Sequence, residues 1–547
     1  MPWYNIPILA ILLAGCGQQA STTPPDTNAD ANTDTAAAAD SSADTQPLWP
    51  PTFVDLVQYV DPMIGTEGPG NVIPGALAPH GMVRVSPDTR EEPGSIDGYE
   101  YGRTRIDGFA HAHLEGPGGS NNGYSHVLFA PTVGEIATLP EDYSSPFSHD
   151  SEEAAPGYYA VTLDGPGVRA EVTAAPRAAV HRYTFPATDS ASLLVDLGYS
   201  RGQSLGGWIQ VADEQTLRGC GEYTVHPLVH LFLGLSDGYT SEARVCFHAV
   251  FSRPFASWGV WDPSGPTTGA DGTEGPQIGA WVTFDTATEE VIEVRVGLSY
   301  IDEDQARDNL EADVGERSFE EVREETAAAW NTLLNRVRVE GGDDEDRTVF
   351  YTALYHSLMQ PADLTEAGGR YMLRVDGTDR IEVAEGWRYH TDDWCMWDTF
   401  RTSHPLGTLV EPERRGDLIR SMLRWYQVGG WLPKCTWRAA GYSRVMIANP
   451  AVPIIADAMA KGFKGFDWDL AWEAARKAAT EDVTNIGDGG LCGYMNLGTP
   501  KDYIDLGYVS HECDTTQAAS MTLEHAHDDW CTAVIAEAVG REDEAAA

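Results

Sequence analysis

The first half of the chain alternates short apolar runs with turns that carry Gly and Pro. Strand-like runs occur in YYAVTLDGPGVRAEVTAA (158–175), AVHRYTFP (179–186) and WVTFDTATEEVIEVRVGLSYI (281–301). Short runs in which apolar and polar residues alternate, bounded by turn residues, are typical of a β-sandwich. We therefore predict an all-β sandwich domain over residues 51–300.

From about residue 303 the apolar residues recur at helical spacing. In 303–337 charged residues separate them, which predicts a linker pair of helices over 301–340. The same spacing returns between Gly- and Pro-bearing loops in 348–361, 417–430, 451–463, 469–479 and 518–540. We predict a helical domain over 341–547, so that the chain is a multidomain β + α protein in which a sandwich precedes a helical part.

The N-terminus has the pattern of an export signal. Residues 5–14 form an apolar run too short to span a bilayer, and the sequence Leu-Ala-Gly-Cys that ends at Cys16 resembles a bacterial lipobox. We predict a lipoprotein signal peptide over 1–16, with a plain secretory peptide as the alternative, and a disordered acidic linker over 17–50. The protein would then be exported and lipid-anchored through Cys16 at the periplasmic or outer surface of a bacterium.

Composition and charge exclude several classes of protein. A hydrophobic fraction of 42% with 16 Trp indicates packed cores, so the chain is neither wholly disordered nor fibrous. The net charge of −47 would repel nucleic acids and anionic membranes, so we expect no nucleic-acid partner and membrane contact only through a lipid anchor. Eight cysteines are present; with Cys16 lipidated an odd number remains, and at least one must be unpaired.

The densest cluster of polar and aromatic residues is RYHTDDWCMWDTFRTSHPL (388–406). Carboxylates and Arg can bind sugar hydroxyls while rings stack on C–H surfaces, so we take Trp397, Asp398, Arg401 and His404 as candidate substrate-binding residues. The alternative is a structural pair between Asp398 and Arg401 at a helix start, because they lie at positions i and i+3.

Two further groups are candidates for chemistry. On a strand His111 and His113 would share a face, where they could bind a metal, contact substrate or form ordinary hydrogen bonds. On a helix Glu524, His527 and Asp528 would share a face that could line a polar cleft or bind a cation. The alternative for the second group is a charged, solvated surface.

Seven motifs, in chain order, resemble glycoside hydrolase family 92, the exo-acting α-mannosidases. They are VDPMIGT…PGALAPHGMVRVSPDT, GYEYGRTRIDGFAHAHLEGPG, EEAAPGYYAVTL, FYTALYHSLMQP, MWDTFRTSHPL, GGWLPKCTW and MTLEHAHDDW. The resemblance implies a supersandwich-like β-sandwich packed on an (α/α)6 barrel, and calcium-dependent hydrolysis of terminal α-mannosides of glycans with inversion. It also implies that Asp398 and Arg401 contact the mannose and that His111 and His113 line the cleft.

The chain also departs from the family pattern. Strings like EGNAWQY, HGNEP and GN(D/E)DCG do not occur in 1–547, so we expect the general acid, the base and most calcium ligands beyond Ala547. The (α/α)6 barrel would be incomplete and an apolar helix face uncovered. Two other functions stay open: a non-catalytic carbohydrate-binding remnant or inactive fragment, and a zinc hydrolase that uses His111, His113 and either Glu524 or His527.

Overall fold

The computed structural model describes residues 53–89, 98–114, 124–224, 242–375, 378–436, 441–442, 446–481, 497–513 and 517–546. Cys16 and the predicted signal peptide and linker lie outside these residues. No helix within the described ranges is long and apolar enough to cross a membrane.

Two antiparallel sheets form the sandwich that the alternating pattern predicts. In strand order, the first sheet contains β1 (Ala76–Leu77), β2 (Arg84–Thr89), β3 (Arg105–Ala110), β4 (Leu128–Val133), β10 (Ala191–Asp196), β17 (Gly279–Phe284), β14 (Ser257–Asp262) and β15 (Gly265–Thr268), while β5 (Ser145–Pro146) pairs with β3. The second contains β16 (Gly272–Glu274), β11 (Gln203–Asp213), β12 (Thr216–Thr224), β13 (Glu242–Phe251), β18 (Val291–Ser299), β9 (Ala178–Thr184), β8 (Val168–Ala174), β7 (Tyr158–Leu163) and β6 (Glu153–Ala155). One apolar core fills the space between them.

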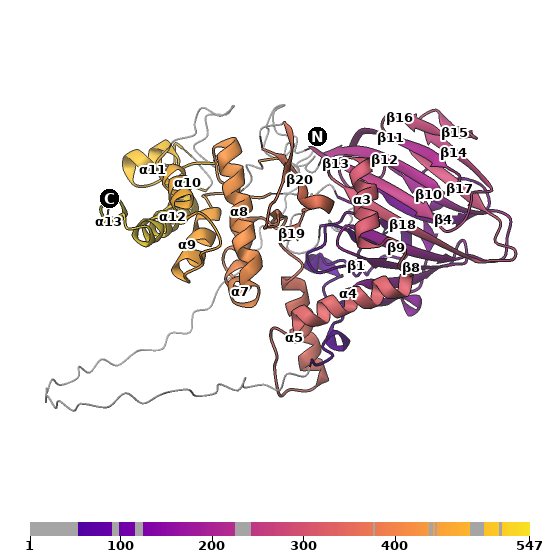
Figure 1. Ribbon diagram of the computed structural model, residues 1–547, viewed down its shortest axis with the longest axis horizontal. Coiled ribbons are helices and arrows are strands. Elements are labelled where there is room, and N and C mark those ends of the chain that lie inside the picture. Colours follow the sequence, from indigo (N-terminus) through magenta and orange to yellow (C-terminus); the bar gives the residue numbers. More distant parts are fainter. Residues whose placement is uncertain are drawn as a thin grey trace, which may run out of the picture. The chain divides into compact units, whose positions relative to one another are not determined.

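Helices α3 (Glu303–Asp313) and α4 (Phe319–Leu334) follow the last strand of the sandwich. Asp302 caps α3, and a capping box between Ser318 and Glu321 starts α4. Apolar residues of these helices pack against the outer side of the second sheet (Figure 1). The linker helices therefore cover a sheet face that would otherwise be exposed.

The buried side chain of Glu366 joins the sandwich to the segment that follows it. Its carboxylate accepts hydrogen bonds from Ser299 Oγ (2.6 Å) and Tyr300 N (2.9 Å) at the end of β18, and from Asn309 Nδ2 (2.9 Å) on α3. Burial raises the pKa of Glu366 to about 7, and these hydrogen bonds oppose the rise.

The rest of the described chain is mainly helical, as predicted. It contains α5 (Asp344–Ser357), α6 (Met396–Thr399), α7 (Ser403–Val410), α8 (Pro412–Gly429), α9 (Ala451–Ala460), α10 (Trp468–Thr480), α11 (Lys501–Leu506), α12 (Ala518–Ala538) and α13 (Glu542–Ala545). Two small two-stranded antiparallel sheets pair β19 (Ala362–Asp363) with β22 (His390–Thr391) and β20 (Arg370–Arg374) with β21 (Asp379–Val383). Helix α5 begins before the predicted residue 348 because the Asp343 side chain caps it.

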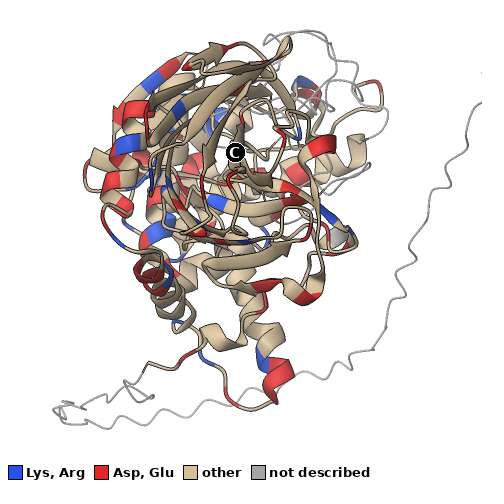
Figure 2. Cartoon of the chain, turned by 90° about the vertical axis from the view of Figure 1, so that its right-hand side faces the viewer, with Lys and Arg blue, Asp and Glu red and all other residues tan. Residues whose placement is uncertain are grey.

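Helices α8, α9, α10 and α12 share a second apolar core (Figure 1). The opposite side of α12 carries Leu523 and Trp530, which are 73% and 65% exposed. They lie seven residues apart and so share one helical face. These two apolar side chains are exposed on the side of α12 away from its buried residues. Acidic residues are distributed along the strands and helices, with Lys and Arg among them (Figure 2).

Candidate active site

Two segments far apart in the sequence meet in the helical part of the chain. Arg401 follows α6, and its Nη2 donates a hydrogen bond to Oε1 of Glu524 on α12 at 2.8 Å. The same guanidinium lies 4.6 Å from the ring centroids of both Trp397 and Phe400. The His527 ring stacks on Phe400, with 5.6 Å between the centroids. The structure thus brings the predicted group around Arg401 into contact with the predicted group around Glu524. Together they form one cluster of an ion pair and aromatic rings.

Asp398 belongs to the same segment but is not the partner of Arg401. The alternative of a structural Asp398–Arg401 ion pair is wrong, because Arg401 forms its ion pair with Glu524. Asp398 is half-buried, and its pKa rises to about 6, mainly through burial and also through the nearby Asp392 charge, while Arg401 opposes the rise. Its carboxyl group is therefore not committed to this guanidinium.

Asp528 lies beside this cluster on the buried side of α12. Its Oδ2 accepts a hydrogen bond from the backbone N–H of Asn449 at 2.6 Å. Burial, with a smaller contribution from Glu524, raises the pKa of Asp528 to about 8. A carboxyl group with this pKa is largely protonated at neutral pH and can donate a hydrogen bond as well as accept one.

The side chain of Asp392 holds the turn that carries Trp397 and Asp398. This buried carboxylate accepts hydrogen bonds from Trp394 N (3.0 Å), Thr399 Oγ1 (2.5 Å) and His404 Nε2 (2.7 Å). Burial alone would raise the pKa of Asp392, but the hydrogen bonds from His404 and Thr399 outweigh it and hold the pKa below its ordinary value.

The prediction that His404 binds substrate directly is wrong in this structure. The side chain is buried, with Nε2 on Asp392 and Nδ1 3.0 Å from Nη1 of Arg415. Both ring nitrogens are therefore occupied within the protein. His404 acts on the candidate site through Asp392, as a positioning residue.

A disulfide closes the same region. Cys395, directly before α6, is bonded to Cys435, and the backbone N–H of Met396 donates to the Lys434 carbonyl at 3.0 Å. A second disulfide joins Cys220 and Cys246 across neighbouring strands β12 and β13. Cys531 is a free buried thiol, which confirms that one cysteine stays unpaired.

The structure corrects the prediction for His111. Its ring lies in the interior of the sandwich, with Nδ1 2.7 Å from the carbonyl of Val127 and Nε2 2.8 Å from Nε2 of His181. The side chain is completely buried, and burial lowers its pKa to about 4. His111 therefore does not line a cleft, because its face of the strand points toward the opposite sheet.

His113 lies in a different buried environment. Its Nδ1 contacts the Arg84 carbonyl at 2.8 Å and its Nε2 contacts Asp88 Oδ2 at 3.1 Å. It is also fully buried, so it too offers no surface to a ligand here. The sandwich reaches the candidate site through the next residue instead: Leu114 and Tyr124 belong to one apolar cluster with the Cys395–Cys435 disulfide and Trp397.

The zinc-hydrolase alternative finds no support in this arrangement. His111, His113 and Glu524 each contact other protein groups, and His527 stacks on Phe400. Over the described ranges no three His, Cys, Asp or Glu side chains form a group that could hold a metal ion. The described residues alone therefore do not fit a zinc or a calcium centre.

Sequence reasoning assigned no role to three residues that shape this region. Asp392 lies in the polar and aromatic cluster of residues 388–406 and Lys434 in the motif GGWLPKCTW, but neither sequence shows which contacts they make. Asp88 lies in the SPDT motif and accepts hydrogen bonds from Ser125 Oγ at 2.6 Å and His113. It is completely buried and therefore needs partners, but the mixed sequence RVSPDT of its strand carries no signal of that burial.

A β-sandwich followed by helices, with carboxyl groups, Arg and aromatic rings gathered in one cluster, is an arrangement suited to carbohydrate recognition. The chain belongs to glycosyl hydrolase family 92: residues 59–299 match the N-terminal domain of that family and residues 305–547 match its catalytic domain.

The relatives come from a fungus and a bacterium. An uncharacterized secreted glycosidase of Arthroderma benhamiae is 26% identical over 90% of this chain and 61% of its own. A family GH92 α-mannosidase from Bacteroides thetaiotaomicron shares 29% identity and a TM-score of 0.79, over 90% of this chain and 64% of its own. A GH92 inverting mannosidase from the same organism shares 28% identity and a TM-score of 0.77 over 90% and 64%. The chain thus spans less than two thirds of the length of these relatives.

Proposed function

We propose that this chain acts in the removal of terminal α-linked mannose from glycans, by hydrolysis with inversion at the anomeric carbon. The contact between Arg401 and Glu524 beside the Trp397 ring carries the proposal, because it joins two separate motifs into one polar and aromatic surface. The GH92 α-mannosidase from Bacteroides thetaiotaomicron has also been solved in complex with mannoimidazole, which supports mannose as the recognised sugar.

In this proposal the described residues bind and orient the sugar. Arg401 and Glu524 would exchange hydrogen bonds with sugar hydroxyls, and Trp397 would supply an apolar ring face. Asp398 and Asp528, whose raised pKa values reflect burial, would accept or donate further hydrogen bonds. Inversion needs an acid and a base about 6.5–9.5 Å apart, and we assign neither role to a residue of this chain.

Calcium dependence is part of the proposal and rests on the family resemblance. Calcium prefers oxygen ligands, and the described residues bring together no group of three His, Cys, Asp or Glu side chains, so we assign the calcium ligands to none of them. When bound, calcium would neutralise charge and fix sugar hydroxyls. Metal analysis of the purified protein, before and after chelation, tests this point separately from activity.

Export and lipid anchoring through Cys16 are also proposed. The fungal relative described above is a secreted glycosidase, which supports export. Intact-mass measurement of the mature protein tests the anchor: a diacylated N-terminal cysteine at position 16 is expected, and an unmodified N-terminus elsewhere would contradict it.

The decisive experiment is mannose release from 4-nitrophenyl α-mannoside and α-mannobioses by protein made from the longest reading frame containing these residues. NMR of the first product would show β-mannose if hydrolysis inverts. Replacing Arg401 with Ala should raise KM roughly 10- to 100-fold, the loss expected for charge-assisted hydrogen bonds. Arg541→Ala is the matched control, because Arg541 forms an exposed ion pair with Glu544 on α13.

The binding-protein alternative keeps one observation in its favour. The chain spans 61–64% of the length of the relatives described above, and no acid or base is assigned within it. Saturable binding of α-mannobiose that Arg401→Ala weakens, without any mannose release, would favour this alternative. Absence of both binding and release would refute both functions for this chain.

A further inference from the structure

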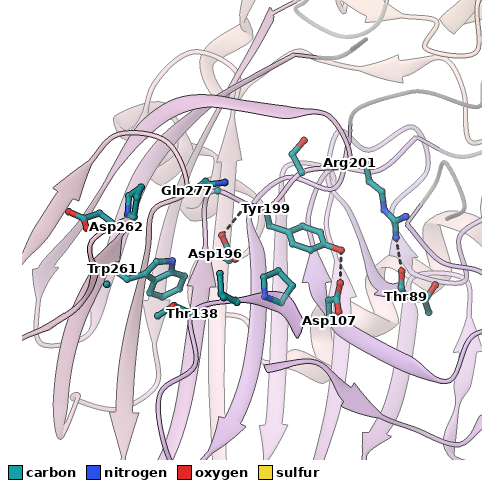
Figure 3. Close-up of a pocket in the computed structure, with 15 residues that line it drawn as sticks. Thr89, Asp107, Thr138, Asp196, Tyr199, Arg201, Trp261, Asp262 and Gln277 are labelled. Carbon is teal, nitrogen blue, oxygen red and sulfur yellow. Dashed lines mark hydrogen bonds between the residues drawn. The ribbon is translucent and has the colours of Figure 1, made fainter. Parts of the chain in front are cut away.

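A cavity of about 770 Å³ opens on the outer face of the first sheet, and none of the residues of the candidate active site lines it (Figure 3). Val195 of β10 belongs to the core between the sheets, so its neighbour Asp196 points to the opposite, outer face. The β14–β15 turn at Asp262 forms one wall, and Thr138, before α1 (Pro140–Tyr143), forms another. Ligand pockets typically measure about 300–1,000 Å³, and this cavity falls in that range.

The carboxyl groups in this cavity are held in place by tyrosines. Asp196 accepts hydrogen bonds from Tyr143 OH (2.8 Å) and from the backbone N–H of Tyr199 (2.9 Å). The hydroxyl of Tyr199 donates to Asp107 Oδ2 at 3.1 Å, and its ring crosses the cavity between the two carboxyl groups (Figure 3). Both carboxyl groups border the cavity but are largely buried, with Asp107 4% and Asp196 6% exposed, and the tyrosines hold them in place.

The charge of the cavity restricts what it can bind. Three aspartates, Asp107, Asp196 and Asp262, line it, so an anionic ligand would be repelled. The one guanidinium in the lining, that of Arg201, donates to the carbonyls of Thr89 (2.7 Å) and Gly98 (2.8 Å), and its Nε lies 3.7 Å from Asp88 Oδ1, so it already has partners within the protein. Within the described ranges no three metal-ligating side chains converge, which argues against a bare cation.

The remaining lining suits a neutral ligand with many hydroxyl groups. Thr138, Ser200 and Gln277 bring groups that both donate and accept hydrogen bonds, and the aspartates accept them. The Trp261 ring, packed over Gly279, adds apolar surface: a Cβ at Gly279 would lie 2.0 Å from its Cζ2 atom. A pyranose ring combines hydroxyl edges with apolar C–H faces and matches both kinds of surface.

We propose that this cavity is a second carbohydrate-binding site, which holds a pyranose unit of a glycan independently of the Arg401–Glu524 cluster. The choice of a sugar as the ligand rests on the proposed function. All residues that line the cavity, however, belong to the sandwich. Such a site would keep a branched or long glycan attached to the protein while its terminal sugar occupies the other site.

Calorimetric titration of the full chain with an α-linked mannotriose tests the proposal. We expect two classes of site in the unchanged protein. Thr138→Trp fills the cavity from its wall and should weaken one class at least about tenfold, whereas Arg401→Ala should weaken the other. Thr267→Trp, at an exposed position on β15 outside the lining, is the matched control and should leave both classes unchanged.

The outcomes separate this proposal from the proposed function. A Thr138→Trp titration identical to that of the unchanged protein, with the same thermal midpoint in both, would overturn the second site. Loss of affinity in Thr138→Trp together with no mannose release by any protein would refute the mannosidase function and keep the second site. Binding of Ca²⁺ alone that Thr138→Trp abolishes, without sugar binding, would also overturn it.

Discussion

Replacing Glu366 with Gln should change how the stability of this protein depends on pH. The Glu366 side chain is buried where β18, α3 and the following segment meet, and its pKa rises from 4.5 to about 7, mainly because burial disfavours the charged form. Between these two pH values the folded chain keeps this proton while the unfolded chain loses it. The free energy of unfolding therefore falls as pH rises through this window.

The size of the effect follows from the two pKa values. Each pH unit of difference is worth 1.36 kcal/mol, so the contribution of Glu366 should fall by about 3 kcal/mol between pH 4.5 and pH 7. Gln carries no titrating proton, and its contribution should stay constant. The hydrogen bonds to Ser299 and Asn309 would be partly lost in the variant at every pH, because the Gln amide NH₂ cannot accept them.

The assay is the difference in unfolding free energy between the unchanged protein and Glu366→Gln, measured by denaturant titration at several pH values from 4.5 to 8. Contributions of all other titrating groups to the unfolding free energy are the same in both proteins and drop out of this difference. We expect it to shift by about 3 kcal/mol in favour of the variant as pH rises. Glu340→Gln, at an exposed position after α4, should show no such shift. Parallel curves for the unchanged protein and Glu366→Gln would refute the reasoning.

Three further changes test other parts of the structure. Burial raises the pKa of Asp528 to about 8, so the unchanged protein should lose stability as pH rises from about 4 to 8, whereas Asp528→Asn should not. Thermal midpoints measured over this pH range should therefore show a growing advantage of the variant, and the absence of such a gain would contradict the prediction. Trp330→Phe should cost about 1 kcal/mol, measured by denaturant unfolding, because it removes the 2.8 Å hydrogen bond from Nε1 to the Leu77 carbonyl; an unchanged midpoint would contradict it. His404→Gln should weaken α-mannobiose binding and shift its pH profile, because Asp392 loses its imidazole partner; a lower thermal midpoint with unchanged binding would instead mean a merely structural role.

The sandwich could be predicted from the sequence because its strands alternate apolar and polar residues over whole segments. Strands β7, β8, β9 and β18 all lie within runs of this kind. The longer helices after residue 303 were predictable for the same reason, since their spacing repeats along long segments. The short helices α7, α11 and α13 were not predicted, because they contain too few turns to show that spacing. Boundaries were less predictable, as in α5, because a single capping side chain decides where a helix begins.

The candidate site could be predicted only in part. Motif content pointed to Arg401 and Glu524, but 123 residues separate them, and only tertiary folding shows that they touch. Strand periodicity placed His111 and His113 on one face without revealing that the first points toward the opposite sheet. His404 was predicted to bind substrate, but its imidazole contacts the buried carboxylate of Asp392. The two residues are twelve positions apart, and this spacing gives no information on the contact.

The bond between Cys395 and Cys435 makes the covalent structure of this segment depend on the compartment in which the chain folds. It encloses α6, α7 and α8 in one covalent ring, with Trp397, Asp398 and Arg401 just inside its entrance. Thiols pair and stay paired in oxidising compartments and are kept reduced in the cytosol. The same polypeptide would therefore close this ring in an oxidising compartment and leave it open in the cytosol, so that the covalent state of the segment reports where the chain has folded.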